Sequence, residues 1–319
     1  MSTTILPDQT GISRLNLFLA LSRTPHLLLD LATPCLAALL CLGTFPSLEI
    51  MALGLITAFS GYTAVYALND IIDYRVDQDI MHSDDMPKPK TDLDSVFVRH
   101  PLAQGMLTYQ EAVIWTIVWA GIALIGSFLL NPLCPVIFLL ASLLEVIYCY
   151  LLKITHMRSI ISGIVKTSGP IAAVFAVNPN PSFAFLFTLF IWLFFWEIGG
   201  QNIPNDLSDL NADRKIKAQT IPVRFGIQGS TLIILSSLVI AAVMSITISL
   251  VLPKPISPLY LLGALFSGFY FLLFPGYRLY QTKAPEEAFH LFNRASYYPI
   301  FMLLVTILSW VFTLNNLTL

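Results

Sequence analysis

The stretch IMALGLITAFSGYTAVYALNDIIDYRVD, residues 50–77, joins an apolar run directly to a group of aspartates. Residues 49–68 are long and apolar enough to cross a bilayer, because a helix needs about 20 residues to do so. The pattern N-D-x-x-D-x-x-x-D follows at once, as Asn69, Asp70, Asp73 and Asp77. This junction predicts a membrane-spanning helix that runs into a carboxylate cluster.

The rest of the chain is equally apolar. Hydrophobic residues make up 56% of its 319 residues, and the mean hydropathy is +0.75, which excludes a soluble globular protein. Candidate spans lie at about 25–44, 49–68, 112–131, 134–152, 160–178, 183–201, 230–251, 258–277 and 297–315. We therefore expect an all-α, polytopic membrane protein with a single domain over residues 1–319. About nine transmembrane helices would surround a central cavity, although the short join around Asn131 and Pro132 leaves eight open.

Lysine and arginine are distributed unevenly between the two sides of this arrangement. With nine spans, only Lys254 of the 17 basic residues lies opposite the N-terminus, so 17 − 1 = 16 lie on or nearest the N-terminal side. The positive-inside rule then makes that side cytoplasmic, together with residues 1–22, 69–111 and 202–229. Eight spans would break this asymmetry. Residues 1–22 lack the pattern of a cleavable signal peptide.

The aspartate pattern occurs a second time, again after an apolar run, as Asn205, Asp206, Asp209 and Asp213. On a helix, Asn69, Asp73 and Asp77 lie at i, i+4 and i+8 and share one face. Like charges repel there, and a divalent cation is the usual physical reason to keep them together. Carboxylate oxygens suit Mg²⁺, which also binds substrate phosphate. Two such clusters predict a diphosphate held between metal sites, with both motifs facing the cavity.

Four further elements occur in order around the two motifs. They are Arg23-Thr24-Pro25, Arg99-His100-Pro101-Leu102-Ala103-Gln104-Gly105, Tyr148-Cys149-Tyr150-Leu151-Leu152-Lys153, and Thr220-Ile221-Pro222-Val223-Arg224-Phe225-Gly226. With both motifs, they resemble the R-P, R-P-L-x-x-G, Y-x-x-x-L-K and T-x-P-x-x-x-G elements of the UbiA superfamily of intramembrane prenyltransferases. The chain departs from the family by a longer gap before Arg99, by His100 after it, and by Lys217 at a position that is often small.

The resemblance implies an Mg²⁺-dependent transfer of a prenyl group from a prenyl diphosphate to a lipid-soluble acceptor within the membrane. Asp73, Asp77, Asp209 and Asp213 would be the main metal ligands and catalytic carboxylates, supported by Asp70 and Asp206. Substrate contacts would come from Asn69, Asn205, Arg23, Arg99 and Lys153. We expect a multi-pass protein of a cell inner membrane, in contact with membrane lipid and not with nucleic acid. Acceptor, prenyl chain length and oligomeric state stay open.

Two other reactions on the same fold remain as alternatives. One is intramembrane terpene cyclisation, in which a double bond of the substrate captures the cation. The other is transfer of a phosphoribosyl group to a polyprenyl phosphate. A cation transporter is disfavoured, because transporters place their ion ligands near the membrane midplane, and here the motifs lie at span ends.

Several polar residues lie outside these motifs. Asp30, Glu145, Lys166 and Glu197 lie in or beside apolar spans, where ionisable groups are functional candidates. Glu197 either contacts the acceptor and its polar network or pairs with Lys166. The five histidines are expected at the surface, and the four cysteines in helix packing. Residues 79–98 form either a lid over the cavity or a solvated linker.

Overall fold

The computed structural model of the protein describes residues 12–81 and 97–317, and all its regular elements there are helices. In chain order they are α1 (Arg14–Leu21), α2 (Thr24–Asp30), α3 (Ala32–Leu42), α4 (Leu48–Met81), α5 (Tyr109–Leu130), α6 (Leu133–Tyr150), η2 (Leu151–Lys153), α7 (Arg158–Val177), α8 (Phe183–Trp196), η3 (Glu197–Asn202), α9 (Ile203–Ser208), α10 (Leu210–Lys215), α11 (Ile221–Thr247), η4 (Ile248–Leu250), α12 (Pro258–Ser267), η5 (Gly268–Leu273), α13 (Phe274–Thr282) and α14 (Pro285–Leu317).

Nine helical stretches in the described part of the chain are long and apolar enough to cross a membrane, which confirms the predicted number. Some spans combine consecutive helices, such as α2 with α3 and α8 with η3 and α9. Large apolar side chains cover the outside; Ile114, Ile117 and Ile125 on α5 are 63%, 65% and 67% exposed. Such a surface is stable in lipid and costly in water. The protein is therefore a multi-pass integral membrane protein.

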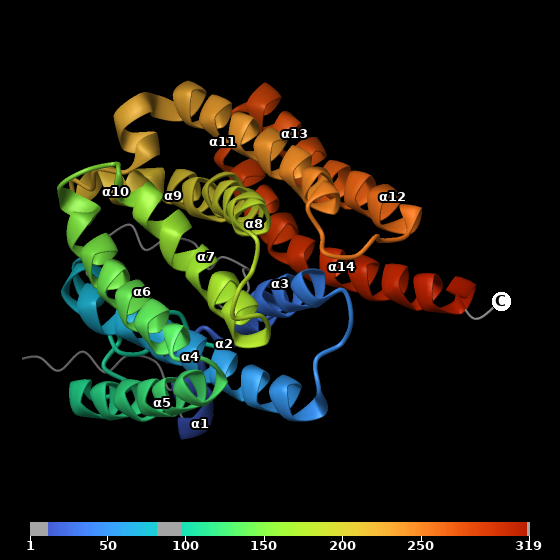
Figure 1. Ribbon diagram of the computed structural model, residues 1–319. Helices are drawn as coiled ribbons and strands as arrows, with labels where there is room; N and C mark the ends of the chain where they lie inside the picture. Colours follow the sequence, from blue (N-terminus) through green and yellow to red (C-terminus); the bar gives the residue numbers. More distant parts are fainter. Residues whose placement is uncertain (1–11, 82–96, 318–319) are drawn as a thin grey trace, which may run out of the picture.

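The helices form two groups with a pair between them. In Figure 1, α4, α5 and α6 lie on one side and α11 to α14 on the other, with α3 and α7 between. The most extensive packing joins α4 to α5, α6 to α7, α3 to α7 and α8 to α11. Within the larger buried core, Trp192 Nε1 donates to the Tyr298 hydroxyl at 3.1 Å and Trp196 Nε1 to the Ala295 carbonyl at 3.0 Å. These bonds fix α8 against α14.

Helix α4 is longer than its apolar part. It continues through the whole first aspartate motif to Met81, beyond the predicted end of the span at residue 68. No glycine or proline interrupts residues 69–81, so the change from apolar to charged side chains does not end the helix. The motif therefore stands on a rigid extension of a membrane span.

The second motif is not preceded by a continuous α-helix; the π-helical segment η3 comes directly before it. A Cβ atom added at Gly199 would lie 2.8 Å from Ser237 Cβ and 2.9 Å from the Ile234 carbonyl oxygen of α11. One added at Gly200 would lie 2.9 Å from Ala295 Cβ of α14. Both glycines are therefore needed for η3 to pack this closely. Segments of π-helix are frequent at functional sites, and this one directly precedes the aspartates.

Candidate active site

Both aspartate motifs, apart from Asp70, line one cavity of about 1590 Å³. Asp70 is buried beside it and pairs with Arg23 and His100. Asn69, Asp73 and Asp77 reach it from α4, at the i, i+4 and i+8 positions that the sequence predicts for one face. The second motif contributes Asn205, Asp206, Asp209 and Asp213. The structure thus brings together two segments that are far apart in the sequence, in the face-to-face arrangement expected of them.

The first motif is held by hydrogen bonds to two other helices, α2 and α6. Arg23 Nη2 donates to Asn69 Oδ1 at 3.1 Å and to Asp70 Oδ1 at 3.3 Å. On the other side of Asn69, its Nδ2 donates to Glu145 Oε1 of α6 at 2.8 Å. Arg23 has a left-handed backbone at φ 45°, which begins α2. These bonds fix the amide of Asn69 and leave Asp73 facing the cavity.

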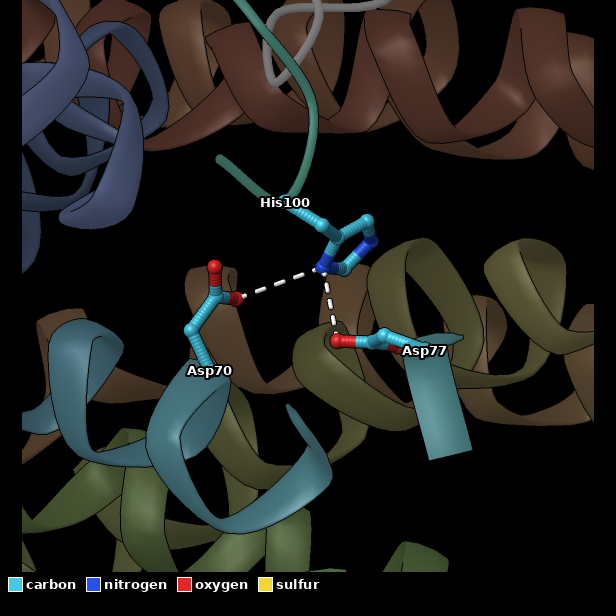
Figure 2. Close-up of side chains that lie close together, drawn as sticks. All are labelled: Asp70, Asp77 and His100. Carbon is cyan, nitrogen blue, oxygen red and sulfur yellow. Dashed lines mark ion pairs between the residues drawn. The ribbon is translucent and has the colours of Figure 1, made fainter. Parts of the chain in front are cut away.

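His100 lies between two aspartates of the first motif, as Figure 2 shows. Its Nδ1 is 2.9 Å from Asp77 Oδ2 and 3.4 Å from Asp70 Oδ1. Burial alone would lower the pKa of this imidazole, but the charges of Asp77 and Asp70 outweigh it and raise the pKa to about 9. The expectation of surface histidines is wrong here, and also for His26, which is only 5% exposed beside Asp30.

The second motif is divided between two short helices. Asp209 ends α9 and begins α10, and its Oδ2 lies 3.7 Å from Arg99 Nη2. Thr220 Oγ1 donates to Asp213 Oδ2 at 2.9 Å. Among the described residues, Asp206 Oδ2 and Asn202 Oδ1 are buried without a hydrogen-bond partner. Buried oxygens of this kind are costly unless a cation or donor is bound.

The donor set therefore fits a divalent metal. Carboxylate oxygens of both motifs converge on one cavity with the amide oxygens of Asn202 and Asn205. All of these are hard oxygen ligands, the type that Mg²⁺ prefers. Asp70, Asp77 and His100 also lie close enough together to hold an ion, but His100 would have to lose its proton before its nitrogen could bind one.

Sequence reasoning missed one cation, Arg158. It is 6% exposed, its guanidinium carbon lies 4.0 Å from the centre of the Tyr148 ring, and it interacts electrostatically with the carboxylates of both motifs. In the sequence, Arg158, Ser162 and Lys166 lie at i, i+4 and i+8 and therefore share one helix face. This spacing could have indicated that Arg158 faces the cavity, as the other two residues do.

Arg23 and Arg99 line the cavity as expected, but Lys153 does not. It is exposed on η2, and the neighbouring Leu152 occupies the cavity wall instead. Residues 82–96, the greater part of the predicted lid or linker, lie outside the described residues.

Away from the aspartates the cavity becomes apolar. Its wall there includes Leu39, Phe45, Ile50, Leu55 and Phe138, from α3, the following turn, α4 and α6. Since the wall follows the membrane spans, this part of the cavity lies at hydrocarbon depth. The site therefore combines a polar end for an anion and an apolar end for a hydrocarbon chain.

Known proteins share this architecture. A solved digeranylgeranylglyceryl phosphate synthase is 18% identical, with a TM-score of 0.67 over 93% of this chain and 98% of that one. A UbiA homologue from Aeropyrum pernix K1, solved in the apo state, is 17% identical with a TM-score of 0.69 over 89% and 97% of the two chains. A UbiA homologue from Archaeoglobus fulgidus bound to DMAPP and Mg²⁺ is 18% identical, with a TM-score of 0.61 over 86% and 98%.

At these identities the structures establish the shared fold. A comparison with curated protein sequences gives no significant match. The model of the UbiA prenyltransferase family, however, matches residues 31–305, which include both aspartate motifs and all but the ends of the helical bundle. The chain belongs to the UbiA prenyltransferase family.

Proposed function

We propose that the protein transfers a prenyl group from a prenyl diphosphate to a lipid-soluble acceptor within the membrane, with Mg²⁺ as cofactor. The observation that carries this proposal is the meeting of two aspartate motifs at the polar end of a largely apolar cavity. A prenyl diphosphate has the same division, with an anion at one end and a hydrocarbon at the other. The A. fulgidus homologue with DMAPP and Mg²⁺ supports this assignment.

The acidic residues of the site are the candidates for holding the metal ions. Asp70, Asp73 and Asp77 on α4, and Asp206, Asp209 and Asp213 on α9 and α10, would hold Mg²⁺ from opposite sides of the diphosphate. Bound Mg²⁺ would neutralise the negative charge that develops on the leaving group.

The cationic and neutral side chains complete the site. Arg23, Arg99 and Arg158 supply fixed cations at the same end of the cavity, suited to the diphosphate oxygens. Asn69 and Asn205 contribute amide groups to the anion. The apolar wall keeps water from the allylic carbon.

The first test is metal dependence. We expect EDTA to abolish the release of diphosphate from geranyl diphosphate and Mg²⁺ to restore it, because six carboxylates cannot hold a diphosphate without divalent cations. Asp73→Asn and Asp209→Asn should each remove most of the activity, since each belongs to a different cluster. The measurement is diphosphate release by purified protein in detergent, with thermal unfolding of each variant to confirm that it is folded.

Glu286→Gln is the matched control, because it also neutralises one carboxylate but lies exposed on α14, outside the cavity. Full activity of either aspartate variant, or turnover unaffected by EDTA, would contradict the two-cluster arrangement.

A further inference from the structure

A second polar group lies deeper in the cavity, beyond the aspartate motifs. Along α7, Arg158 interacts with both motifs, Ser162 lies one turn further and Lys166 one turn beyond that, all lining the cavity. Successive members are four residues apart, which is a rise of about 6 Å along the helix, at 1.5 Å per residue. Glu197 of η3 reaches the same level, because Ser162 Oγ donates to its Oε1 at 2.9 Å. Polar side chains therefore form a layer below the level of Arg158, where the reacting carbon of a bound prenyl diphosphate would lie.

Most groups in this layer are already paired. Lys166 Nζ donates to Asp30 Oδ2 at 2.5 Å and contacts the Tyr66 hydroxyl at 3.0 Å, and that hydroxyl donates to the same Asp30 oxygen. The predicted alternative of a Glu197–Lys166 pair is thus replaced by a Lys166–Asp30 pair. Lys166 still lies near enough to interact electrostatically with Glu197. It therefore stabilises negative charge on that carboxylate without a direct bond.

One carboxylate oxygen of Glu197, Oε2, is buried and has no hydrogen-bond partner among the described residues. The residue is 7% exposed and lines the cavity. A buried carboxylate oxygen without a donor is costly in free energy. The glycine pair at 199 and 200 holds the backbone that follows Glu197 in tight contact with α11 and α14, which fixes the position from which the Glu197 side chain extends. Because Glu197 lines the cavity, a molecule bound there could donate a hydrogen bond to this carboxylate once the side chain turns toward it.

We propose that Glu197 is the proton acceptor for an acceptor substrate that carries a hydroxyl group, and that Lys166 and Ser162 position it. This inference rests on the proposed prenyl transfer. It favours transfer over cyclisation, because a cyclising substrate would bring only hydrocarbon to this layer and leave the Glu197 oxygen unpaired. A hydroxyl supplies the missing donor.

The step balances without any further reactant. The C1–O bond of the prenyl diphosphate breaks, and the diphosphate leaves with the electron pair. The acceptor oxygen forms a new bond to C1 with one of its lone pairs. Its proton passes to Oε2 of Glu197 and from there to water, which regenerates the carboxylate.

The experiment uses the full chain in detergent with Mg²⁺ and geranyl diphosphate. Hexadecanol and 4-dodecylphenol serve as hydroxyl probes, and their methyl ethers as controls that differ only in the missing donor. Binding is measured by the shift in unfolding temperature, and transfer by the mass of the ether product. Wild-type protein should bind each alcohol more tightly than its methyl ether, and should prenylate at least one of them.

Glu197→Gln should abolish the preference for the hydroxyl and slow transfer by about 10²-fold or more, the size of a general-base effect. Glu197→Asp should restore part of the rate, and Glu286→Gln should behave as wild type. The pH profile of transfer gives a second readout that a purely structural role would not change. Glu197→Gln should lose one ionisation from the acidic limb, whereas the part of that limb that the motif aspartates contribute should remain.

The two proposals fail in different ways. Equal binding of alcohol and ether by wild-type protein, wild-type transfer by Glu197→Gln, or a hydrocarbon product in place of an ether would each overturn the role of Glu197. If Glu197→Gln does not fold, Glu197→Asp and the wild-type comparison of alcohol with ether decide alone. Absence of Mg²⁺-dependent diphosphate release from wild-type protein would instead overturn the proposed function. The comparison of alcohol and ether binding would still test whether Glu197 accepts a hydrogen bond from a hydroxyl group.

Discussion

Arg158 shows how much one side chain contributes to the polar end of the cavity. It is a cation that is 6% exposed, and it stacks on the Tyr148 ring, whose hydroxyl accepts from Asn202 Nδ2 at 3.0 Å. A buried guanidinium needs anions around it, and the motif carboxylates provide them only in part once metal ions bind. A diphosphate would supply the remaining charge.

We therefore expect Arg158→Gln and Arg99→Gln to reduce kcat/KM for geranyl diphosphate by about ten- to a hundredfold each. A hydrogen bond to a charged group contributes about 1.5–3 kcal/mol, which corresponds to that range. Lys153→Gln should change kcat/KM little, because Lys153 is exposed on η2 and absent from the cavity wall. Steady-state kinetics with varied geranyl diphosphate make the comparison.

The opposite order of effects would contradict the assignment of Arg158 and Arg99, and not Lys153, to the diphosphate. If Lys153→Gln loses activity while both arginine variants keep it, the diphosphate lies nearer η2 than the aspartate motifs. Unchanged kinetics in all three variants would leave the diphosphate held by metal ions alone.

At this scale the sequence predicted the carboxylates but not all of their partners. The aspartates could be found because their spacing repeats along the chain. Arg158 was hidden among the basic residues that the positive-inside rule already explains. His100 was visible as an extra residue between Arg99 and Pro101, but its place between Asp70 and Asp77 depends on how the loop folds back, at φ 52°.

Among the elements, η3 depends most strongly on particular residues, because its close packing requires glycine. Gly199→Ala would put a methyl group 2.9 Å from the Ile234 carbonyl oxygen of α11. This oxygen belongs to the helix backbone and cannot rotate away as a side-chain atom could. Overpacking of this kind costs about 1–3 kcal/mol. We expect Gly199→Ala to lower the unfolding temperature in detergent and to reduce prenyl transfer together, because η3 carries Glu197 and leads into the second motif.

Gly121→Ala in α5 is the matched control, since a Cβ there meets nothing within 4 Å. It should be neutral or slightly stabilising, because alanine favours a helix by about 1 kcal/mol over glycine. An unfolding temperature for Gly199→Ala equal to that of Gly121→Ala would show that η3 adjusts without strain.

Helix boundaries were the least predictable part of the fold. Hydropathy ends the second span near residue 68, whereas the helix continues to Met81, because hydropathy measures burial in lipid and not backbone conformation. The π-helical turn at η3 has no hydropathy signal at all. Its only trace in the sequence is the adjacent pair Gly199 and Gly200, which indicates close packing once the neighbours are known.

For the whole molecule, the hydropathy pattern and the distribution of basic residues were enough to predict nine membrane-spanning helices, and the described part of the chain contains nine. The central cavity was expected from the two facing motifs and from the family resemblance, and both motifs do line one. The depth and the wall of the cavity could not be predicted from periodicity, because the lining residues come from helices as far apart in the chain as α2 and α14 and depend on which helices are neighbours. The exposed apolar surface of α5 also explains why hydropathy succeeds: lipid-facing and buried side chains are both apolar.

The orientation of the molecule in the membrane is the last prediction, and it rests on charge. If the positive-inside rule holds, the connection after α13 is cytoplasmic and the connection between α7 and α8 is external. Gln281 and Asn180 are exposed in or beside these two connections. A cysteine at Gln281 should react with a membrane-impermeant thiol reagent only in inverted vesicles, and one at Asn180 only in intact cells.

The parent protein is the control for this labelling, because three of its four cysteines are buried and Cys35 is half-buried. Labelling of both new cysteines from the same side would require an even number of spans between residues 180 and 281, where the structure has three. Labelling from opposite sides but in the reverse sense would keep the nine spans and invert the molecule. The aspartate motifs would then face outward, and prenyl diphosphate would have to reach the cavity from outside the cell.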